Sequence, residues 1–121
     1  MDGGQSGERK AARRDAERGA RKGWTGRVRI RYYIDPETEL PHIYRHAVSE
    51  QEVEEVMRRP GEDRLGREGS RVALGRTASG RYLRVIYAPD PEPDSVFVIA
   101  AYELRGKPLL AYRRRRRRKV T

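Results

Sequence analysis

The sequence predicts an α+β fold in which one short helix packs on a small antiparallel sheet of three or four strands. Residues 48–60 carry the start, stripe and stop signals of an amphipathic helix. Four other segments, 28–34, 70–76, 81–88 and 95–104, are rich in β-branched and aromatic residues, as strands are. Their order predicts a strand, then the helix, then a three-stranded meander.

The positive charge of the chain lies at its two ends. Of the 121 residues, 28 are Lys or Arg and 18 are Asp or Glu, so the net charge is +10. Residues 1–31 carry +6 (ten cations, four anions), residues 32–112 carry −3 (eleven, fourteen) and residues 113–121 carry +7 (seven, none). Basic ends can hold a phosphate polymer by releasing its counterions, but they can equally serve solubility or pair with an acidic protein.

This distribution predicts three regions. Residues 1–27 form a basic N-terminal segment without a large apolar residue before Trp24, so we expect it to be disordered. Residues 28–112 form the α+β domain. Residues 113–121 form an arginine-rich tail that we expect to be frayed.

Several classes of protein are excluded by composition. No apolar run approaches the roughly 18 residues that span a bilayer, and the basic N-terminus has no apolar stretch of a secretory signal. The absence of cysteine excludes disulfides, a zinc ribbon and thiol catalysis. With His42 and His46 as the two histidines, we expect no metal and no other cofactor. The expected location is the cytoplasm.

The helix is the clearest local signal. Ser49 followed by Glu52 is a capping box, and Val48 with Val53 is a hydrophobic staple around the same helix start. Pro60 and Gly61 stop the helix. The apolar stripe that should face the sheet consists of Val53, Val56 and Met57.

The flanking segments are assigned by turn signals. Asp35-Pro36 marks a turn, and Pro41 allows only an edge or irregular strand after it. Residues 61–70 are polar and glycine-rich, which predicts a loop. The continuous apolar run 95–104 predicts a central strand, and we expect Leu109 and Leu110 to pack back onto the domain.

The two strands around the sequence TASG fit a hairpin with a four-residue loop. If Arg76 pairs with Arg81, then Arg71, Arg84 and Tyr82 fall on the face opposite the apolar one. Such a face is either solvated or binds phosphate, since arginine offers a planar fork of donors and tyrosine can stack on a base.

Three segments together resemble a known family. They are IYRHAVSEQEVEEVMRRP (43–60), GRYLRVIY (80–87) and VFVIAAY (96–102), followed by Tyr112. Their order and spacing resemble the BrnT-like toxins and their small uncharacterised relatives within the RelE/ParE group. The resemblance covers residues 28–112. One departure is Tyr102, which stands where the family strand Ile-Ser-Ala-Arg ends in arginine.

The resemblance implies a small antiparallel α+β fold and a metal-independent endoribonuclease, the toxin of a type II toxin–antitoxin module. Its partners would be RNA, free or on ribosomes, and a cognate antitoxin protein. Metal-free cleavage by the RNA 2′-hydroxyl needs proton transfer, for which histidine is suited, and stabilisation of phosphorane charge, for which arginine is suited. The candidate catalytic residues are His46, Arg71, Arg81, Arg84 and Tyr102.

Two alternatives stay open. The protein can instead be a non-catalytic domain that binds nucleic acid or an antitoxin through its basic ends, and His46 can simply be a helix-entry residue bonded to backbone. Tyr87, which alternates with core positions, is more typical of the core than of a site. The candidate nucleic-acid-binding residues of the tail are Arg113, Arg114, Arg115, Arg116, Arg117, Arg118 and Lys119.

Overall fold

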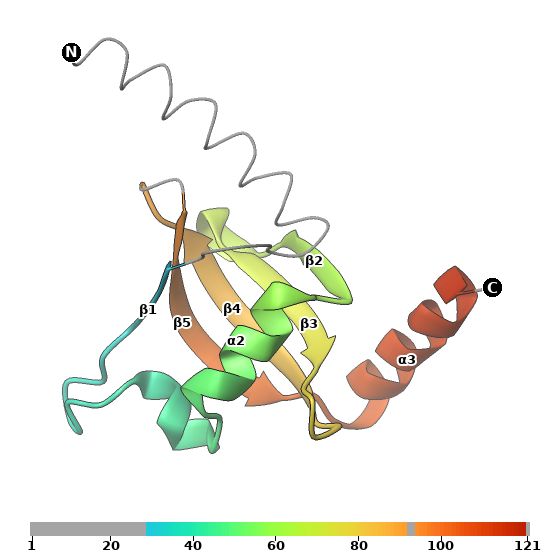
Figure 1. Ribbon diagram of the computed structural model, residues 1–121, viewed down its shortest axis with the longest axis horizontal. Helices are drawn as coiled ribbons and strands as arrows, with labels where there is room; N and C mark the ends of the chain where they lie inside the picture. Colours follow the sequence, from blue (N-terminus) through green and yellow to red (C-terminus); the bar gives the residue numbers. More distant parts are fainter. Residues whose placement is uncertain (1–28, 92–93, 121) are drawn as a thin grey trace, which may run out of the picture.

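A five-stranded sheet in the order β1-β5-β4-β3-β2 organises the computed structural model, which describes residues 29–91 and 94–120 (Figure 1). Helix α2 crosses one face of this sheet, and α3 extends from the end of β5 on the other side. The elements are β1 (Arg29–Tyr32), the 3-10 helix η1 (His42–His46), α2 (Glu50–Arg58), β2 (Glu62–Leu65), the 3-10 turn η2 (Arg67–Gly69), β3 (Arg71–Arg76), β4 (Tyr82–Pro89), β5 (Ser95–Glu103) and α3 (Gly106–Val120).

The predicted α+β class is confirmed, but the sheet has five strands instead of three or four and is mixed instead of antiparallel. Strand β1 runs parallel to β5, with Ile30 opposite Val96. Strand β2 lies within the segment predicted as a loop and pairs antiparallel with β3 at the sheet edge. Its sequence EDRL has no alternating apolar pattern, which is why the sequence predicts no strand there.

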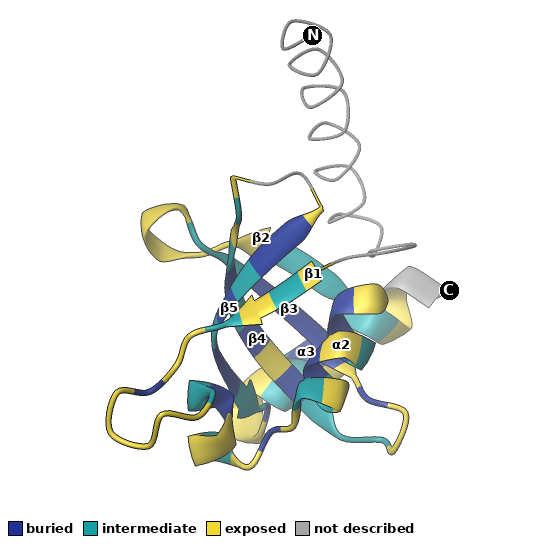
Figure 2. Cartoon of the chain, turned by 60° about the vertical axis from the view of Figure 1, so that its left-hand side comes forward, coloured by how far each residue is buried: buried dark blue, intermediate teal, exposed yellow. Residues whose placement is uncertain are grey.

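Helix α2 forms as its sequence signals predict. The Ser49 hydroxyl accepts a hydrogen bond from the Glu52 amide, and the Glu52 carboxylate accepts one from the Ser49 amide, which completes the capping box. Val53, Val56 and Met57 are buried against β3, β4 and β5, and the opposite side of the helix is exposed (Figure 2). This packing forms the main hydrophobic core.

A second, smaller core lies on the other face of the sheet. Tyr112 of α3 is buried there with Val72, Leu74 and Leu104, and Leu109 packs against them. The expected frayed tail is therefore wrong, because the arginine run continues the helix that Tyr112 anchors. Leu110, which we expected to pack, is 57% exposed because it points away from this anchor.

The assumed hairpin register is wrong by one residue. Arg76 pairs with Tyr82, because the amide of Thr77 bonds the carbonyl of Arg81 and Gly80, at φ 95°, closes a loop of five residues. A shift of one residue exchanges the faces of a strand. Arg71 therefore shares the α2 face with Tyr87, whereas Arg84 lies beside Leu74 on the α3 face.

The predicted disorder of residues 1–27 lies outside the described residues. Among residues 29–91 and 94–120, no helix is both long and apolar enough to cross a membrane.

Candidate functional site

Arg71 is held inside the fold. Its guanidinium donates to a carboxylate oxygen of Asp63 at 2.9 Å and to the Asp63 carbonyl at 3.1 Å. The Asp63 side chain is only 1% exposed and also accepts a 2.6 Å hydrogen bond from the Tyr87 hydroxyl. Burial and the neighbouring Asp63 carboxylate raise the pKa of Tyr87. Tyr87 is thus a core residue, as predicted, and Arg71 joins β2 to β3.

Arg81 is also engaged by neighbouring groups. Its guanidinium donates to the Ala47 carbonyl at 2.7 Å and to the Glu52 carboxylate at 3.0 Å, and it lies 3.5 Å from the Glu103 carboxylate. These contacts tie the start of α2 to the hairpin and to the end of β5. Two of the three candidate arginines are therefore occupied by internal carboxylates.

His46, Tyr102 and Arg84 are brought together. Among the described residues, β1 pairs with residues 95–98 of β5, and η1 packs against β5, which brings His46 to Tyr102. The two rings are 4.3 Å apart between centroids, and Tyr102 is paired with the exposed Arg84 across β5 and β4. The assumed register placed Arg71 on the same face as Arg84, and this is wrong, because the true register puts Arg71 on the opposite face.

Behind His46 lies a second histidine. The rings of His42 and His46 are 5.5 Å apart, and Nδ1 of His42 lies 3.3 Å from the Asp35 carboxylate. Asp35 is buried and also accepts a hydrogen bond from Arg45. The Arg45 contact, together with a bond from the Glu37 amide, lowers the pKa of Asp35 to about 2. Asp35 is therefore an anionic anchor for the loop that carries both histidines.

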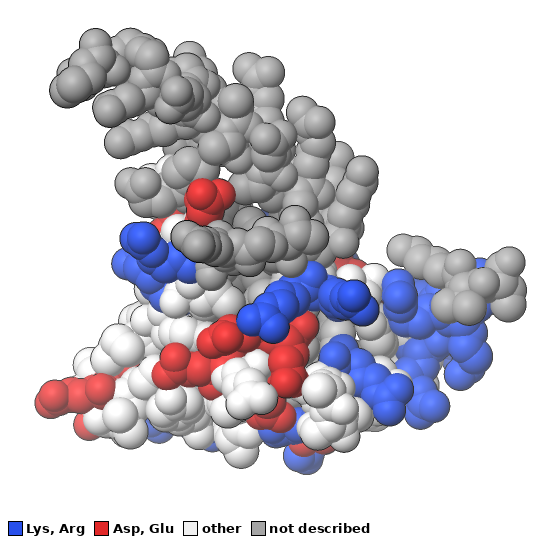
Figure 3. All heavy atoms as spheres, viewed as in Figure 1, with Lys and Arg blue, Asp and Glu red and all other residues white. Residues whose placement is uncertain are grey.

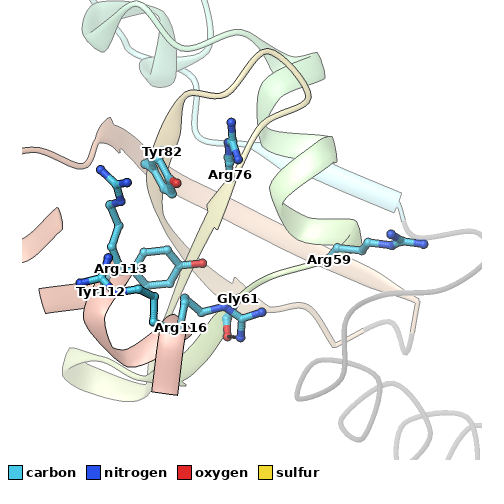
Figure 4. Close-up of a pocket in the computed structure, with 8 residues that line it drawn as sticks. Arg59, Gly61, Arg76, Tyr82, Tyr112, Arg113 and Arg116 are labelled. Atoms are coloured by element: carbon cyan, nitrogen blue, oxygen red, sulfur yellow. Dashed lines mark hydrogen bonds between the residues drawn. The ribbon is translucent and has the colours of Figure 1, made fainter. Parts of the chain in front are cut away.

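The most distinctive surface feature is a groove of about 550 Å³ between α3, the end of β3 and the end of α2 (Figure 4). We call it the basic groove. Its lining residues come from four separate parts of the chain, which is why the sequence did not reveal it. They are Arg59, Gly61, Arg76, Tyr82, Tyr112, Arg113, Arg116 and Arg117.

Two tyrosines build the wall of the basic groove. Their rings meet edge to face, with 6.0 Å between the centroids of Tyr82 and Tyr112. The guanidinium carbons of Arg76 and Arg113 lie 5.6 and 5.8 Å from the centroid of Tyr82, within cation–π range. Burial raises the pKa of Tyr112, so its hydroxyl stays neutral, and its ring supports that of Tyr82, on which the arginines lie.

A glycine lets α3 approach. A Cβ atom added to Gly61 would lie 1.8 Å from the Tyr112 hydroxyl oxygen, so any larger residue would have to displace the ring. The carbonyl of Gly61 accepts a 3.0 Å hydrogen bond from Arg116, and Glu62 forms a two-pronged ion pair with Arg115 at 2.5 and 2.9 Å. The segment 61–62 therefore fixes the position of the arginine helix.

Charge is strongly one-sided around the basic groove. Among the described residues that line it, none is acidic, and Arg59, Arg76 and Arg113 form no ion pair with a carboxylate of the described chain. Lys and Arg side chains gather over α3 at the right of Figure 3, whereas acidic side chains gather over the middle of the molecule. Such a groove suits an anion with several phosphates more than it suits a proton-transfer reaction.

The predicted tail residues divide into groups. Arg113, Arg116 and Arg117 line the basic groove, Arg115 pairs with Glu62, and Arg114 and Arg118 are exposed. The side chain of Lys119 lies outside the described part. In the same described part of the chain, no group of three or more His, Asp or Glu side chains is placed to hold a metal ion.

No protein-family model matches this chain, and neither the curated proteins nor the solved structures contain a significant match to it.

Proposed function

We infer that the protein binds nucleic acid by holding its phosphate backbone in the basic groove. The observation that carries this inference is the lining itself: five arginines and two tyrosines, with no acidic residue among the described lining residues. A cluster of cations in a concave surface releases condensed counterions when a polyanion enters, and arginine binds phosphate oxygens through a planar fork of donors. The cytoplasmic location expected from the sequence belongs to this proposal, whereas the expected RNA partner belongs to the second candidate function below.

The groove favours backbone contact over base recognition. The Tyr82 ring already has the guanidinium groups of Arg76 and Arg113 close to it, so it offers little free face on which a base could stack. Contacts to phosphates position a protein on nucleic acid but carry no sequence information. We therefore expect binding that depends strongly on salt and weakly on sequence.

The test is fluorescence anisotropy with short labelled oligonucleotides across a range of salt concentrations. Arg76→Gln and Arg113→Gln should each weaken binding. Each should also flatten the plot of log affinity against log salt, by about 0.7 for each phosphate of a single strand that the variant no longer binds. Arg67→Gln is the matched control, because Arg67 is exposed in η2 and does not line the groove.

The control separates groove binding from net charge. All three variants lose one positive charge, so an equal loss of affinity in Arg67→Gln would show that binding follows only the total charge. Wild-type affinity in both groove variants, with circular dichroism showing intact folding, would also contradict the proposal.

A second candidate function is RNA cleavage of the toxin type, restrained by an antitoxin protein. The specific observation that favours it is the 4.3 Å contact between the rings of His46 and Tyr102, with Arg84 paired to Tyr102 across the strands. In this candidate, His46 transfers a proton to or from the RNA, and Arg84 stabilises charge on the phosphorus. Arg71 and Arg81 take structural roles, because both are engaged by carboxylates.

Expression without a partner tests this second candidate. The wild type should slow bacterial growth and cut RNA, and His46→Ala and Arg84→Ala should relieve both effects by about a hundredfold or more, the usual contribution of an acid–base group. Arg67→Ala serves as the control for removal of a surface charge. Uncut RNA with the wild-type protein, free or on ribosomes, would leave nucleic-acid binding as the sole function.

A further inference from the structure

Helix α3 is packed on the domain along one side only. Leu109, Tyr112, Arg115 and Arg116 face the domain and are buried or half-buried. The exposed residues of the helix include Lys107, Leu110, Arg113, Arg114, Arg117 and Arg118. In Figure 1 the C-terminal turns of α3 extend away from the sheet. The outer side of this helix is therefore exposed to solvent over residues 107–118.

The exposed cations form two stripes. Residues four apart lie on one side of a helix, so Arg113 and Arg117 form one stripe, and Arg114 and Arg118 form the other. Successive residues are about 100° apart, which separates the stripes by about that angle. Leu110, 57% exposed, lies between them at the outermost edge. The first stripe also lines the basic groove.

The diameter and length of α3 fit the major groove of B-form DNA. An α-helix with its side chains is about 10–12 Å across, and the major groove of B-form DNA is about 12 Å wide, with a row of phosphates on each side. The major groove of A-form RNA is too narrow and deep for side chains to read. Fifteen residues give α3 a length of about 22 Å, enough to lie along the groove for several base pairs.

We propose that α3 enters the major groove of double-stranded DNA. The phosphates of one strand lie in the basic groove against Arg113 and Arg117, and those of the other strand contact Arg114 and Arg118. Leu110 faces the base edges, where an apolar side chain can contact the methyl group of thymine. The proposal rests on the proposed phosphate-binding function and adds the form of the nucleic acid and the element that enters its groove.

The experiment compares a DNA duplex, an RNA duplex of the same sequence and the DNA single strand in one anisotropy series with the full chain. The DNA duplex should bind most tightly, on the order of tenfold better than the RNA duplex, because A-form geometry removes the second row of phosphate contacts. Methylation of guanine N7 by dimethyl sulfate, which probes the major groove, should be suppressed on binding. A minor-groove drug should not compete.

Two pairs of substitutions then separate the proposal from the function on which it rests. Arg114→Gln with Arg118→Gln should reduce DNA-duplex binding but spare single-strand binding, whereas Arg76→Gln with Arg113→Gln should reduce both. Single-strand binding without a preference for duplex DNA, or duplex binding without N7 protection, would overturn the major-groove proposal and leave phosphate binding standing. A failure of every polynucleotide to bind would overturn both.

Discussion

At the scale of single residues, Asp63 joins three neighbouring strands. It lies on β2, pairs with Arg71 of β3 and accepts a hydrogen bond from Tyr87 of β4. The side chain of Asp63 and the residue Tyr87 are buried, and that of Arg71 is 21% exposed. A buried ion pair gives modest net stability while intact, but removing one partner leaves the other charge buried without compensation. The triad therefore makes the β2 edge depend on a single carboxylate.

We predict that Asp63→Ala lowers the free energy of unfolding by about 3–5 kcal/mol, because the Arg71 charge and the Tyr87 hydroxyl both lose their partner. Tyr87→Phe, which removes one hydrogen bond and leaves the ion pair, should cost about 1–2 kcal/mol. Urea unfolding measures both values. If the two variants were destabilised equally, Asp63 would not be the centre of the triad.

The lowered pKa of Asp35 predicts that the free energy of unfolding depends on pH. Its pKa falls from 3.8 to about 2 because Arg45 and the Glu37 amide bind the carboxylate in the folded state. A lowered folded-state pKa stabilises the protein above the unfolded pKa, and the gain disappears as pH falls through the folded value. The stability difference between wild type and Asp35→Asn should thus be constant above about pH 5 and shrink towards pH 2. A difference that stayed constant over this range in urea titrations would contradict the assignment.

At the scale of elements, a helix or strand could be predicted when the residues that determine it lie within its own sequence. Helix α2 carries its own cap, stripe and stop within thirteen residues, so its sequence sufficed. Strand β2 has no such pattern and exists because β3 offers it a partner. The sequence of helix α3 resembles a charged tail, because the residues that hold it are distant in the chain. Arg115 and Arg116 bond residues 53 and 55 positions away, and Tyr112 packs with Val72 and Leu74.

The packing of α3 on the domain depends on the small size of Gly61, which lies against Tyr112. Gly61→Ala should lower the free energy of unfolding by about 1–3 kcal/mol, the usual cost of overpacking, because the new Cβ collides with the Tyr112 hydroxyl. The damage should be local. Hydrogen exchange should accelerate in α3 more than in α2, whose core lies on the opposite face of the sheet. Tyr112→Phe in the same background should recover part of the stability, and a uniform acceleration would contradict this account.

At the scale of the whole molecule, some parts of the candidate sites could be predicted from the sequence and others could not. The basic ends were evident from composition, and the family resemblance named His46 and Tyr102 as candidates, but the contact between their rings appears only in the structure. The basic groove was not predictable, because it forms only when the ends of α2, β3 and the middle of α3 meet. The faces of Arg71 and Arg84 depended on a register that the loop around Gly80 decides.

The same charge distribution affects the stability of the whole fold. Helix α3 carries eight Lys and Arg residues and no acidic residue, so its cations repel one another unless anions are bound. Two effects of added salt oppose each other here. Screening relieves the repulsion along α3, but it also weakens ion pairs such as the one between Arg115 and Glu62. A specific anion is therefore distinguished from screening only when ionic strength is held constant.

Pyrophosphate provides that test. At constant ionic strength set with sodium chloride, pyrophosphate should raise Tm, because a ligand that binds only the folded state stabilises it by RT ln(1 + [L]/Kd). At ten times Kd this is about 1.4 kcal/mol, or a shift of roughly 6–11 °C for a domain of this size. Arg76→Gln with Arg113→Gln should remove most of the shift, because both guanidinium groups line the basic groove. Arg67→Gln should keep it. An equal shift in all variants would assign the anion to general charge neutralisation, and the basic groove would then not be the site that binds phosphate.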